Sequence, residues 1–425
     1  MTGVIEIERI VVLNDASVAA GGATGLALAS AEAFGRLGIP TVFLAGDAGQ
    51  NPSLAAAGVE AAGLGQARLL SSPMSKVILG AVYNQAAERM ISDWIAEFDT
   101  PGTIYHLHGW AQIFSPSVFR PLTKVADRLV LSAHDFFLVC PNGSYSFLRS
   151  GEVCTLTPQS LRCVAAHCDR RSYAHKLWRV ARQAVRRMTF DLSRERPTVL
   201  AIHERMRPFL ERGGVPADVI RALPNPVRAF LDVRVKAECN DEFLFIGRLE
   251  HGKGPDLACA AATAAGVKLR VIGDGPMGDA LKRDYPNVTF SGRLPSDEIE
   301  PLARGARALI MPSRYPEPYG LVAAEALWSG LPVIAARTAF LAPDIVARCA
   351  GIACEPRDTQ GLAQAMRSLA DDDETTLAMS MAAFNDTRDI GLTFDCWVAA
   401  LLDTYRERLA FSAARRAPLQ SEPAS

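Results

Sequence analysis

Short hydrophobic runs alternate with amphipathic stretches along nearly the whole chain. The runs RIVVLN, TVFLA, TIYHLH, RLVLSAH and TVLAIH predict strands of a first sheet, and EFLFIG, KLRVIG, NVTFSG, RALIMPS and LPVIAA predict strands of a second. The amphipathic stretches between these runs predict helices. This alternation is typical of α/β proteins, in which helices cover both faces of a parallel sheet.

The pattern lapses between the two groups of strands. The segment RALPNPVRAFLDVRVKAECND carries a rigid turn at Pro224, Asn225 and Pro226, because proline fixes its own backbone angle. We therefore predict an N-terminal domain over residues 1–230 and a C-terminal domain over 231–390. A helix over 391–410 follows, and the polar, proline- and alanine-rich residues 411–425 predict a disordered tail.

Composition narrows the class of protein. A chain of 425 residues fits two domains, and 45 basic against 46 acidic residues give no reason to expect a nucleic-acid partner. The chain lacks the run of about eighteen apolar residues that spans a membrane, and glutamates stand in its first residues where a signal peptide is basic and then apolar. These features predict a soluble, cytoplasmic protein.

The stretch KLRVIGDGPMGDALKR holds Gly273, Gly275 and Gly278, a G-x-G-x-x-G pattern between a strand and a helix. A dinucleotide fingerprint follows the first strand of its unit, and an acidic residue ends the next strand about twenty residues on. Here the strand is the second of its domain, and the next strand ends in Gly292 and Arg293. We therefore predict a loop that lines a nucleotide site and reject a dinucleotide-dependent oxidoreductase.

A second glycine loop lies in FLFIGRLEHGKGPDL, between the first strand of the C-terminal domain and a helix that begins near Pro255. Its glycines allow a ligand to approach the backbone, the helix start offers N–H donors, and Arg248 and Lys253 add positive charge. This combination predicts a diphosphate site, although either cation alone also fits a solvated turn.

Two glutamates stand in PSRYPEPYGLVAAEALWSGLPVIAA, with a helix predicted to begin near Tyr319 or Gly320. Glu317 precedes that helix and Glu325 lies more than a turn inside it. A carboxylate at such a place can accept hydrogen bonds from sugar or ribose hydroxyls. The alternative for Glu325, in an alanine-rich segment, is a simple helix former.

These motifs together resemble the retaining GT-B glycosyltransferases of the family-4 type, the glycosyl transferases group 1. The resemblance rests on four motifs: G-R-L-x-x-x-K-G (Gly247 to Gly254), G-D-G-P (Gly273 to Pro276), SGRLP, and E-P-Y-G-L-x-x-x-E (Glu317 to Glu325). It covers roughly residues 240–370. It implies two facing Rossmann-like domains with parallel sheets and an interdomain cleft. It also implies that the helix over 391–410 crosses back onto the N-terminal domain.

The resemblance further implies site roles. Arg248 and Lys253 bind the donor diphosphate, Glu325 binds ribose hydroxyls, and Glu317 contacts the transferred sugar. The other implied donor-binding residues are Gly22, Gly247, Gly273, Asp274, Gly275, Pro276, Pro318, Tyr319, Gly320 and Leu321. Gly21 and Gly22 resemble the family's N-terminal glycine loop, but Ala23 and Thr24 stand where that loop usually has an acid.

Histidines mark the N-terminal domain. His106 and His108 are two apart in YHLHGW and so share one face of a strand, and His134 and Asp135 end another strand. The resemblance implies that His108 lies near the reacting centre and is catalytic, together with Glu317, Arg248 and Lys253. It places His106, His134 and Asp135 on the acceptor side, whereas a packed, hydrogen-bonded residue at a sheet end is the alternative for each histidine.

An insertion over about 136–170 resembles one found in a subset of these enzymes and carries Cys140, Cys154, Cys163 and Cys168. Four thiolates could bind a structural zinc ion, with His167 as an alternative ligand. The alternative is buried free thiols, because the spacing lacks a C-x-x-C pair.

The segment 172–189 predicts a basic amphipathic helix. Its cations and the two just before it are Arg170, Arg171, Lys176, Arg179, Arg182, Arg186 and Arg187. Such a helix predicts peripheral contact with an anionic membrane at its inner face, and its alternative is a helix that buries its apolar stripe and exposes its arginines.

The predicted function is retaining transfer of a hexose from a nucleotide-diphosphate sugar to a saccharide or lipid-linked acceptor, in polysaccharide or glycolipid biosynthesis. Apart from the acidic run at residues 371–373, the chain has no D-x-D pattern, so we expect no catalytic metal or other cofactor. Two alternatives remain open: another GT-B enzyme such as a sugar-nucleotide epimerase, and a non-catalytic protein that binds a nucleotide sugar.

Overall fold

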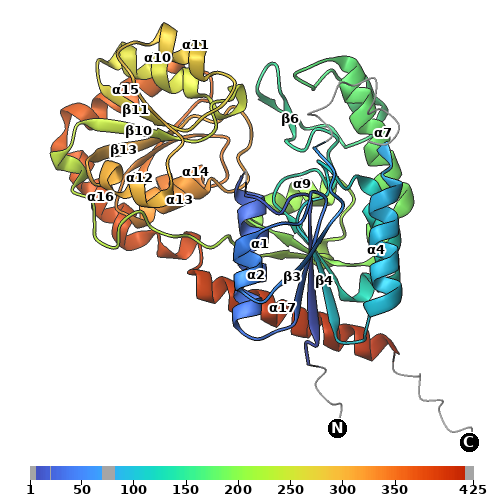
Figure 1. The fold of residues 1–425 in the computed structure, drawn as a ribbon. Helices are drawn as coiled ribbons and strands as arrows, with labels where there is room; N and C mark the ends of the chain where they lie inside the picture. Colours follow the sequence, from blue (N-terminus) through green and yellow to red (C-terminus); the bar gives the residue numbers. More distant parts are fainter. Residues whose placement is uncertain (1–5, 20, 69–81, 417–425) are drawn as a thin grey trace, which may run out of the picture.

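The structure is a computed structural model that describes residues 6–19, 21–68 and 82–416. Two α/β domains stand side by side (Figure 1), and each is built on a parallel sheet. Every predicted hydrophobic run contains a strand, and most strand residues are buried. Strands that are covered on both faces need no polar alternation, which explains why their sequences are hydrophobic runs.

The N-terminal sheet has seven strands in the order β3-β2-β1-β4-β5-β8-β9. These are β1 (Arg9–Asn14), β2 (Thr41–Ala45), β3 (Glu60–Gly63), β4 (Thr103–Leu107), β5 (Leu129–Ala133), β8 (Thr198–Ala201) and β9 (Ile220–Ala222). Its helices are α1 (Gly22–Arg36), α2 (Pro52–Ala56), α4 (Gln85–Phe98), α5 (Phe119–Leu122), α6 (Leu161–Ala165), α7 (Tyr173–Thr189), α8 (Leu192–Glu195) and α9 (Arg207–Arg212). A small hairpin of β6 (Ser146–Phe147) and β7 (Glu152–Val153) lies in the cysteine-bearing insertion.

The C-terminal sheet has six strands in the order β12-β11-β10-β13-β14-β15. These are β10 (Glu242–Ile246), β11 (Lys268–Ile272), β12 (Thr289–Gly292), β13 (Ala306–Met311), β14 (Val333–Ala336) and β15 (Gly351–Cys354). Its helices are α10 (Pro255–Ala265), α11 (Gly278–Asp284), α12 (Ser296–Arg304), α13 (Leu321–Trp328), α14 (Ala342–Ala347), α15 (Thr359–Asp371) and α16 (Asp373–Asp386).

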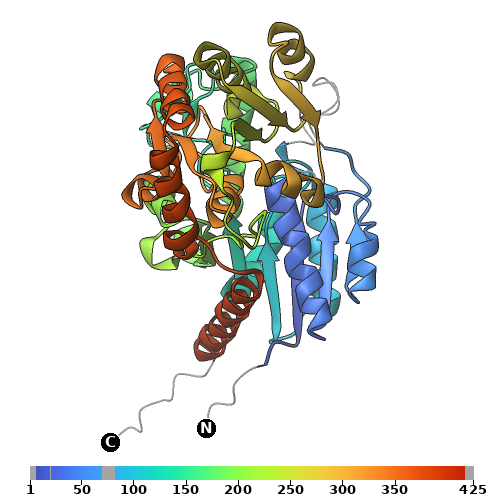
Figure 2. The same ribbon diagram turned by 90° about the vertical axis from the view of Figure 1, so that its left-hand side faces the viewer.

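Helix α17 (Phe394–Arg416) crosses back to the N-terminal domain, and Figures 1 and 2 show it running beside that domain's sheet. Trp397, Leu401 and Tyr405 are buried in the same core cluster as Ile10 and Val12 of β1. The predicted disorder of 411–425 is wrong for residues 411–416, because they continue this helix. Residues 417–425 lie outside the described residues.

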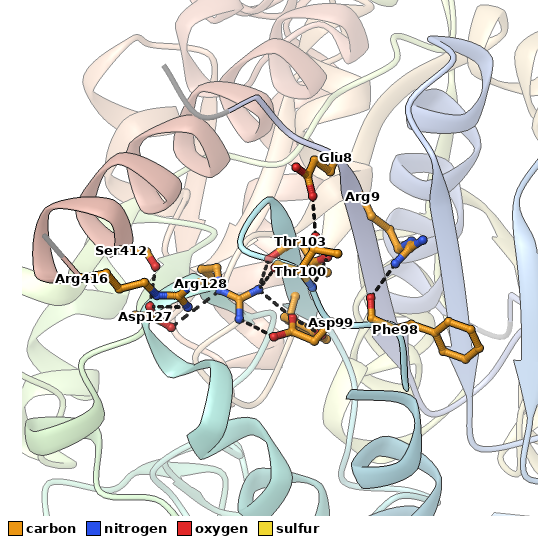
Figure 3. A network of polar contacts seen from close by, with 11 residues as sticks. Glu8, Arg9, Phe98, Asp99, Thr100, Thr103, Asp127, Arg128, Ser412 and Arg416 are labelled. Carbon is orange, nitrogen blue, oxygen red and sulfur yellow. Dashed lines mark hydrogen bonds and ion pairs between the residues drawn. The ribbon is translucent and has the colours of Figure 1, made fainter. Parts of the chain in front are cut away.

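A polar network holds the last turns of α17 and the base of the N-terminal sheet (Figure 3). Arg128, which is 1% exposed, donates to both carboxylate oxygens of Asp99 at 2.7 and 2.8 Å. It also donates to the backbone carbonyls of Thr100 and Thr103. Beside it, Asp127 binds Ser412 and Arg416. The network therefore joins the loop before β4, the loop before β5 and α17.

Helix α7 turns its basic face toward the domain, whereas the membrane hypothesis requires that face to be exposed. Its buried residues are Lys176, Arg182, Gln183 and Arg186, whereas Leu177 is 42% and Met188 84% exposed. Arg182 donates to the carbonyl of Ala111, and Arg186 to that of Phe190. The predicted contact of Arg179, Arg182 and Arg186 with anionic lipids is therefore not supported, because these side chains are directed into the domain. Within the described residues, no helix has both the length and the hydropathy needed to cross a bilayer.

Candidate functional site

The loop between β10 and α10 is packed against the loop that follows β13. Gly254 directly precedes α10 with φ of 72°, and a Cβ there would lie 2.3 Å from the carbonyl oxygen of Pro312. Only glycine fits this approach without strain. The contact places Lys253 directly beside Glu317, which comes from a separate part of the chain.

Lys253 and Glu317 form a partly buried ion pair. The Lys253 Nζ lies 2.7 Å from Oε2 of Glu317, and the same oxygen accepts a hydrogen bond from Ser313 at 3.1 Å. Burial alone would raise the pKa of Glu317, but the ammonium and the hydrogen bonds lower it below its usual range. Burial likewise opposes the charge on Lys253, yet Glu317 and Tyr315 raise its pKa above the ordinary value. Both groups are therefore ionised at neutral pH.

The G-D-G-P loop packs against the loop after β10. Gly273 has φ of 142°, and a Cβ there would lie 1.9 Å from the carbonyl oxygen of Gly247. Gly275 has φ of 150°, and the N–H of Leu249 donates to the carbonyl of Asp274 at 2.7 Å. The spacing of Gly273 and Gly275 therefore allows two loops to pack closely at the carboxyl edge of the sheet. The side chains of Asp274 and Pro276 remain exposed.

Arg248 and Lys253, the two cations predicted to bind the diphosphate, lie in different surroundings. Arg248 has a side chain that is 64% exposed and pairs with Glu250 at 2.9 Å, whereas the side chain of Lys253 is 25% exposed. No contact joins Arg248 to the Lys253–Glu317 pair in the described part of the chain, so a shared role for the two cations stays a prediction.

Helix α13 carries the second glutamate. Gly320 precedes it with φ of 78°, followed by Leu321 as the first helical residue. Burial raises the pKa of Glu325 to about 8, and only the charge of Arg228 opposes this. The carboxyl is therefore largely neutral at pH 7 and able to donate as well as accept a hydrogen bond.

Tyr319 has a structural role in this conformation. Its hydroxyl donates to the carbonyls of Asn225 and Ile390 at 3.1 and 3.0 Å, which ties the interdomain segment to the chain just before α17. Pro318, its buried neighbour, begins the sharp turn that Gly320 completes.

The histidines divide into two groups. His106 is fully buried, with Nδ1 2.6 Å from the hydroxyl of Tyr405 and Nε2 2.8 Å from Oγ of Ser132. Both of its ring nitrogens are thus used inside the protein, so its expected place on the acceptor side is not supported. His108 Nδ1 lies 3.0 Å from Nε2 of His134, while His108 Nε2 is buried and has no partner.

His108, His134 and Asp135 line an open hollow at the carboxyl ends of β1, β4 and β5. Its volume, including the open mouth, is about 730 Å³. Gly22 begins α1, and no atom lies within 4 Å of a Cβ built at that position. Thr24 of the N-terminal glycine loop also lines the hollow, together with residues that were not predicted from the sequence, namely Asn14, Asp15, Trp110, Gln112 and Phe137.

Asp15 shapes one wall of this hollow. Its carboxylate accepts hydrogen bonds from the backbone N–H groups of Gln112, Ile113 and Phe114 at 2.7 to 2.8 Å. It therefore fixes the loop that carries Trp110. An acidic residue directly after the first strand was the available signal, because strand ends of a parallel sheet meet at one edge.

The hollow and the Lys253–Glu317 pair are linked across the domain interface. Phe136, between two lining residues, has its ring 6.1 Å from that of Phe340. The N–H of Phe340 donates to the carbonyl of Glu317 at 3.1 Å. Arg205 of the N-terminal domain also pairs with Asp344 of α14.

The zinc hypothesis is not supported. Within residues 6–19, 21–68 and 82–416, no three His, Cys, Asp or Glu side chains are arranged to hold a metal ion. Cys140, Cys154, Cys163 and Cys168 are buried free thiols, and His167 is exposed. Lys176, 1% exposed, takes part in their packing, with Nζ 3.5 Å from the sulfur of Cys163.

Comparison with known proteins gives consistent results. Residues 230–386 match the family model of glycosyl transferases group 1. Over 153 residues the chain is 36% identical to glycogen synthase of Mycobacterium tuberculosis, a stretch that covers 33% of this chain and 37% of that protein. Curated relatives are thus matched over little more than a third of their length.

Two solved structures align with almost the whole chain. Sucrose-phosphate synthase of Thermosynechococcus elongatus has a TM-score of 0.68 at 15% identity, covering 95% of this chain and 99% of that one. Anabaena HepE in complex with UDP-glucose has a TM-score of 0.61 at 16% identity, covering 96% and 99%. At such identity the likeness shows the fold, and the predicted GT-B fold is confirmed.

Proposed function

We propose that this GT-B protein, whose residues 230–386 match the family model of glycosyl transferases group 1, transfers a hexose from a nucleoside-diphosphate donor to an acceptor in its N-terminal domain. The observation that carries the proposal is the ionised Lys253–Glu317 pair in the interdomain region. A relative that bears UDP-glucose in its solved structure supports a nucleotide sugar as donor.

Lys253 is the group proposed to bind the donor diphosphate. A buried ammonium stabilises the charge that develops on a departing diphosphate, and a preorganised one does so without reorganisation during the reaction. Glu317 accepts a hydrogen bond from this ammonium and is itself held by the hydroxyl of Ser313, so Glu317 positions Lys253 in the free enzyme. Contact of Glu317 with the transferred sugar, as the resemblance implies, is part of the proposal.

Glu325 and Arg248 complete the proposed donor site. A largely neutral Glu325 inside α13 suits the hydroxyls of a ribose, since it can donate and accept. Arg248 is free to turn from Glu250 toward a diphosphate because its side chain is mostly exposed. The proposal also includes retention of the anomeric configuration. It further includes saccharide or lipid-linked acceptors and a role in polysaccharide or glycolipid biosynthesis in the cytoplasm.

The test combines donor binding and transfer. A panel of nucleotide sugars is screened by thermal shift, and the stabilising donor is then assayed for transfer to saccharide and lipid-diphosphate acceptors. We expect Lys253→Met to lower transfer by at least about tenfold, as loss of one charged transition-state contact does. The matched control is Lys268→Met, whose exposed side chain pairs with Asp241 on the same domain.

Three other outcomes are distinguishable. Turnover of the donor without any acceptor would assign an epimerase. Binding of the donor without turnover would assign a non-catalytic binding protein. Equal activity of the two lysine variants would remove Lys253 from the site. Proton NMR of the product's anomeric centre tests retention.

A further inference from the structure

The hollow at the carboxyl ends of β1, β4 and β5 carries information about the acceptor. We infer that it binds an uncharged saccharide and selects against phosphorylated acceptors. This inference rests on the proposed glycosyltransferase function, which leaves the chemical class of the acceptor open.

The shape and the surface of the hollow fit a sugar. Trp110 and Phe137 are partly exposed aromatic residues in its lining. Asn14, Gln112 and Thr24 add amide and hydroxyl groups. A few polar groups among aromatic walls are typical of small-molecule sites, and this mixture suits the apolar faces and the hydroxyls of a pyranose.

The charge of the lining argues against a phosphate. Asp15 and Asp135 line the hollow, whereas no lysine or arginine does among the described residues. Sites that take phosphate groups typically present arginine or lysine beside backbone N–H donors. The first turn of α1 contributes Ala23 and Thr24 to the lining, so the donors of a helix start are present, but a phosphorylated acceptor would meet two carboxylates without a cationic side chain to offset them.

The nearest arginines lie behind the lining of the hollow. Arg182 lies behind the hollow, with its guanidinium carbon 6.0 Å from the centre of the Trp110 ring, and the charge of Asp15 acts on it. Arg179 lies 5.6 Å from the Phe137 ring and pairs with Asp169 at 2.8 Å. The charge of Arg179 also acts on Asp135, but within the described residues no ion pair joins Asp135 to a cation.

The histidines add hydrogen-bonding capacity without positive charge. Burial lowers the pKa of His134 to about 4, and that of His108 falls well below its usual range. Both imidazoles are therefore neutral at pH 7. The Nε2 of His108 is buried without a partner, and since a buried polar atom is costly when unpaired, a sugar hydroxyl in the hollow would satisfy it.

The hollow also lies where an acceptor must be. Phe136 follows Asp135 and contacts Phe340, which is hydrogen-bonded to the backbone of Glu317. The hollow is thus linked to the loop of Glu317 in the proposed donor site through the Phe136–Phe340 contact.

Matched acceptor pairs test the inference. Glucose is compared with glucose 6-phosphate, fructose with fructose 6-phosphate, and inositol with inositol 1-phosphate, using UDP-glucose or whichever donor the thermal-shift panel selects. We expect kcat/KM for each uncharged member to exceed that of its phosphorylated partner by at least about tenfold, a difference of about 1.4 kcal/mol.

Charge variants connect this preference to the hollow. We expect Asp135→Asn to raise the acceptor KM and leave the donor KM unchanged, and Asp135→Lys to shift the pair preference at least about tenfold toward phosphate. Asp241→Lys is the matched control, since Asp241 is an exposed residue of the C-terminal domain. We expect it to keep the wild-type preference.

The contrary outcomes are separable. Preference for phosphorylated members, or identical ratios for Asp135→Lys and Asp241→Lys, overturns the inference and leaves the transferase proposal intact. A phosphate preference that Arg182→Met abolishes would identify the hollow as an anion site, because two nitrogens of Arg182 lack partners. Absence of transfer to every acceptor, with donor bound, removes the transferase proposal itself.

Discussion

The Lys253–Glu317 pair gives a prediction with two independent measurements. The perturbations are Lys253→Met, Glu317→Gln and the double variant. At 2.7 Å, two unit charges attract by roughly 6 kcal/mol at an effective dielectric constant of about 20. Desolvation of both groups offsets most of this attraction, so the pair itself contributes little net stability.

Removal of one partner has a larger effect than removal of both. It leaves the other charge buried without compensation, which costs about 3–5 kcal/mol for a fully buried pair. Because the side chain of Lys253 is 25% exposed, we expect each single variant to lose about 2–3 kcal/mol of unfolding free energy, below that range. The double variant should lose no more than either single one. Urea denaturation with a double-mutant cycle measures this coupling.

Binding of UDP separates the roles of the two residues. Lys253→Met removes a charge-assisted hydrogen bond worth about 1.5–3 kcal/mol, so the Kd for UDP should rise about 10- to 150-fold. Glu317→Gln keeps the ammonium and should change the Kd by less than about threefold, well under 1 kcal/mol. Isothermal titration at pH 7 measures both, with Lys268→Met as control. Wild-type UDP affinity in Lys253→Met, or simple additivity in the cycle, would refute the reasoning.

Three further predictions concern stability. Glu325 has a pKa of about 8 in the folded protein, against an ordinary value of 4.5. Its contribution to the free energy of unfolding is therefore fully present below pH 4.5 and is lost as the pH rises toward 8. The unfolding free energy of wild type minus Glu325→Gln should fall over that window by up to about 1.4 kcal/mol per pH unit, and parallel profiles would contradict this. Gly273→Ala should cost at least about 3 kcal/mol, because its Cβ would lie 1.9 Å from a backbone oxygen. Gly266→Ala, at φ of 71° with open space, should cost only about 1–2 kcal/mol, and equal urea midpoints would contradict the packing argument. Arg128→Met should lower the unfolding free energy by about 3–4 kcal/mol, because it leaves one carboxylate and two carbonyls without their partner. The side chain of Arg416 is 45% exposed, so Arg416→Met should change the unfolding free energy by no more than about 0.5 kcal/mol. Equal losses of the two variants in thermal unfolding would contradict this difference.

The hydrophobic runs were sufficient to predict the interior strands and one edge strand, β12, but they missed the other three edge strands, β3, β9 and β15. The edge strand β3 has the sequence EAAG, and all of its residues are exposed, so it carries no hydrophobic signal. At the opposite edge, β9 has three residues and begins just before the segment where the pattern lapses. Edge strands bury less surface than interior ones, and a pattern of burial therefore reports them weakly.

The site was predictable where the backbone itself requires a residue type. Gly254, Gly273 and Gly320 have positive φ and tight neighbours, so their spacing is a direct record of the loop geometry. The partner of Lys253 was not predictable from spacing, because Glu317 is 64 positions away and the two loops meet only through the sheet. Asp15 and Trp110 were missed for the same reason, since only the folded sheet brings β1 and β4 together.

Helix α7 shows why amphipathicity alone does not fix orientation. The sequence correctly separates a basic face from an apolar one, and the usual expectation exposes the basic face. In the fold, the carbonyl of Ala111 and the carboxylate of Asp169 provide partners for Arg182 and Arg179. Because buried charges are tolerated when such partners exist, the basic face is turned inward. Reversing these arginines to glutamate would therefore disrupt the N-terminal domain, and loss of liposome binding in that variant would carry no information about lipid contact.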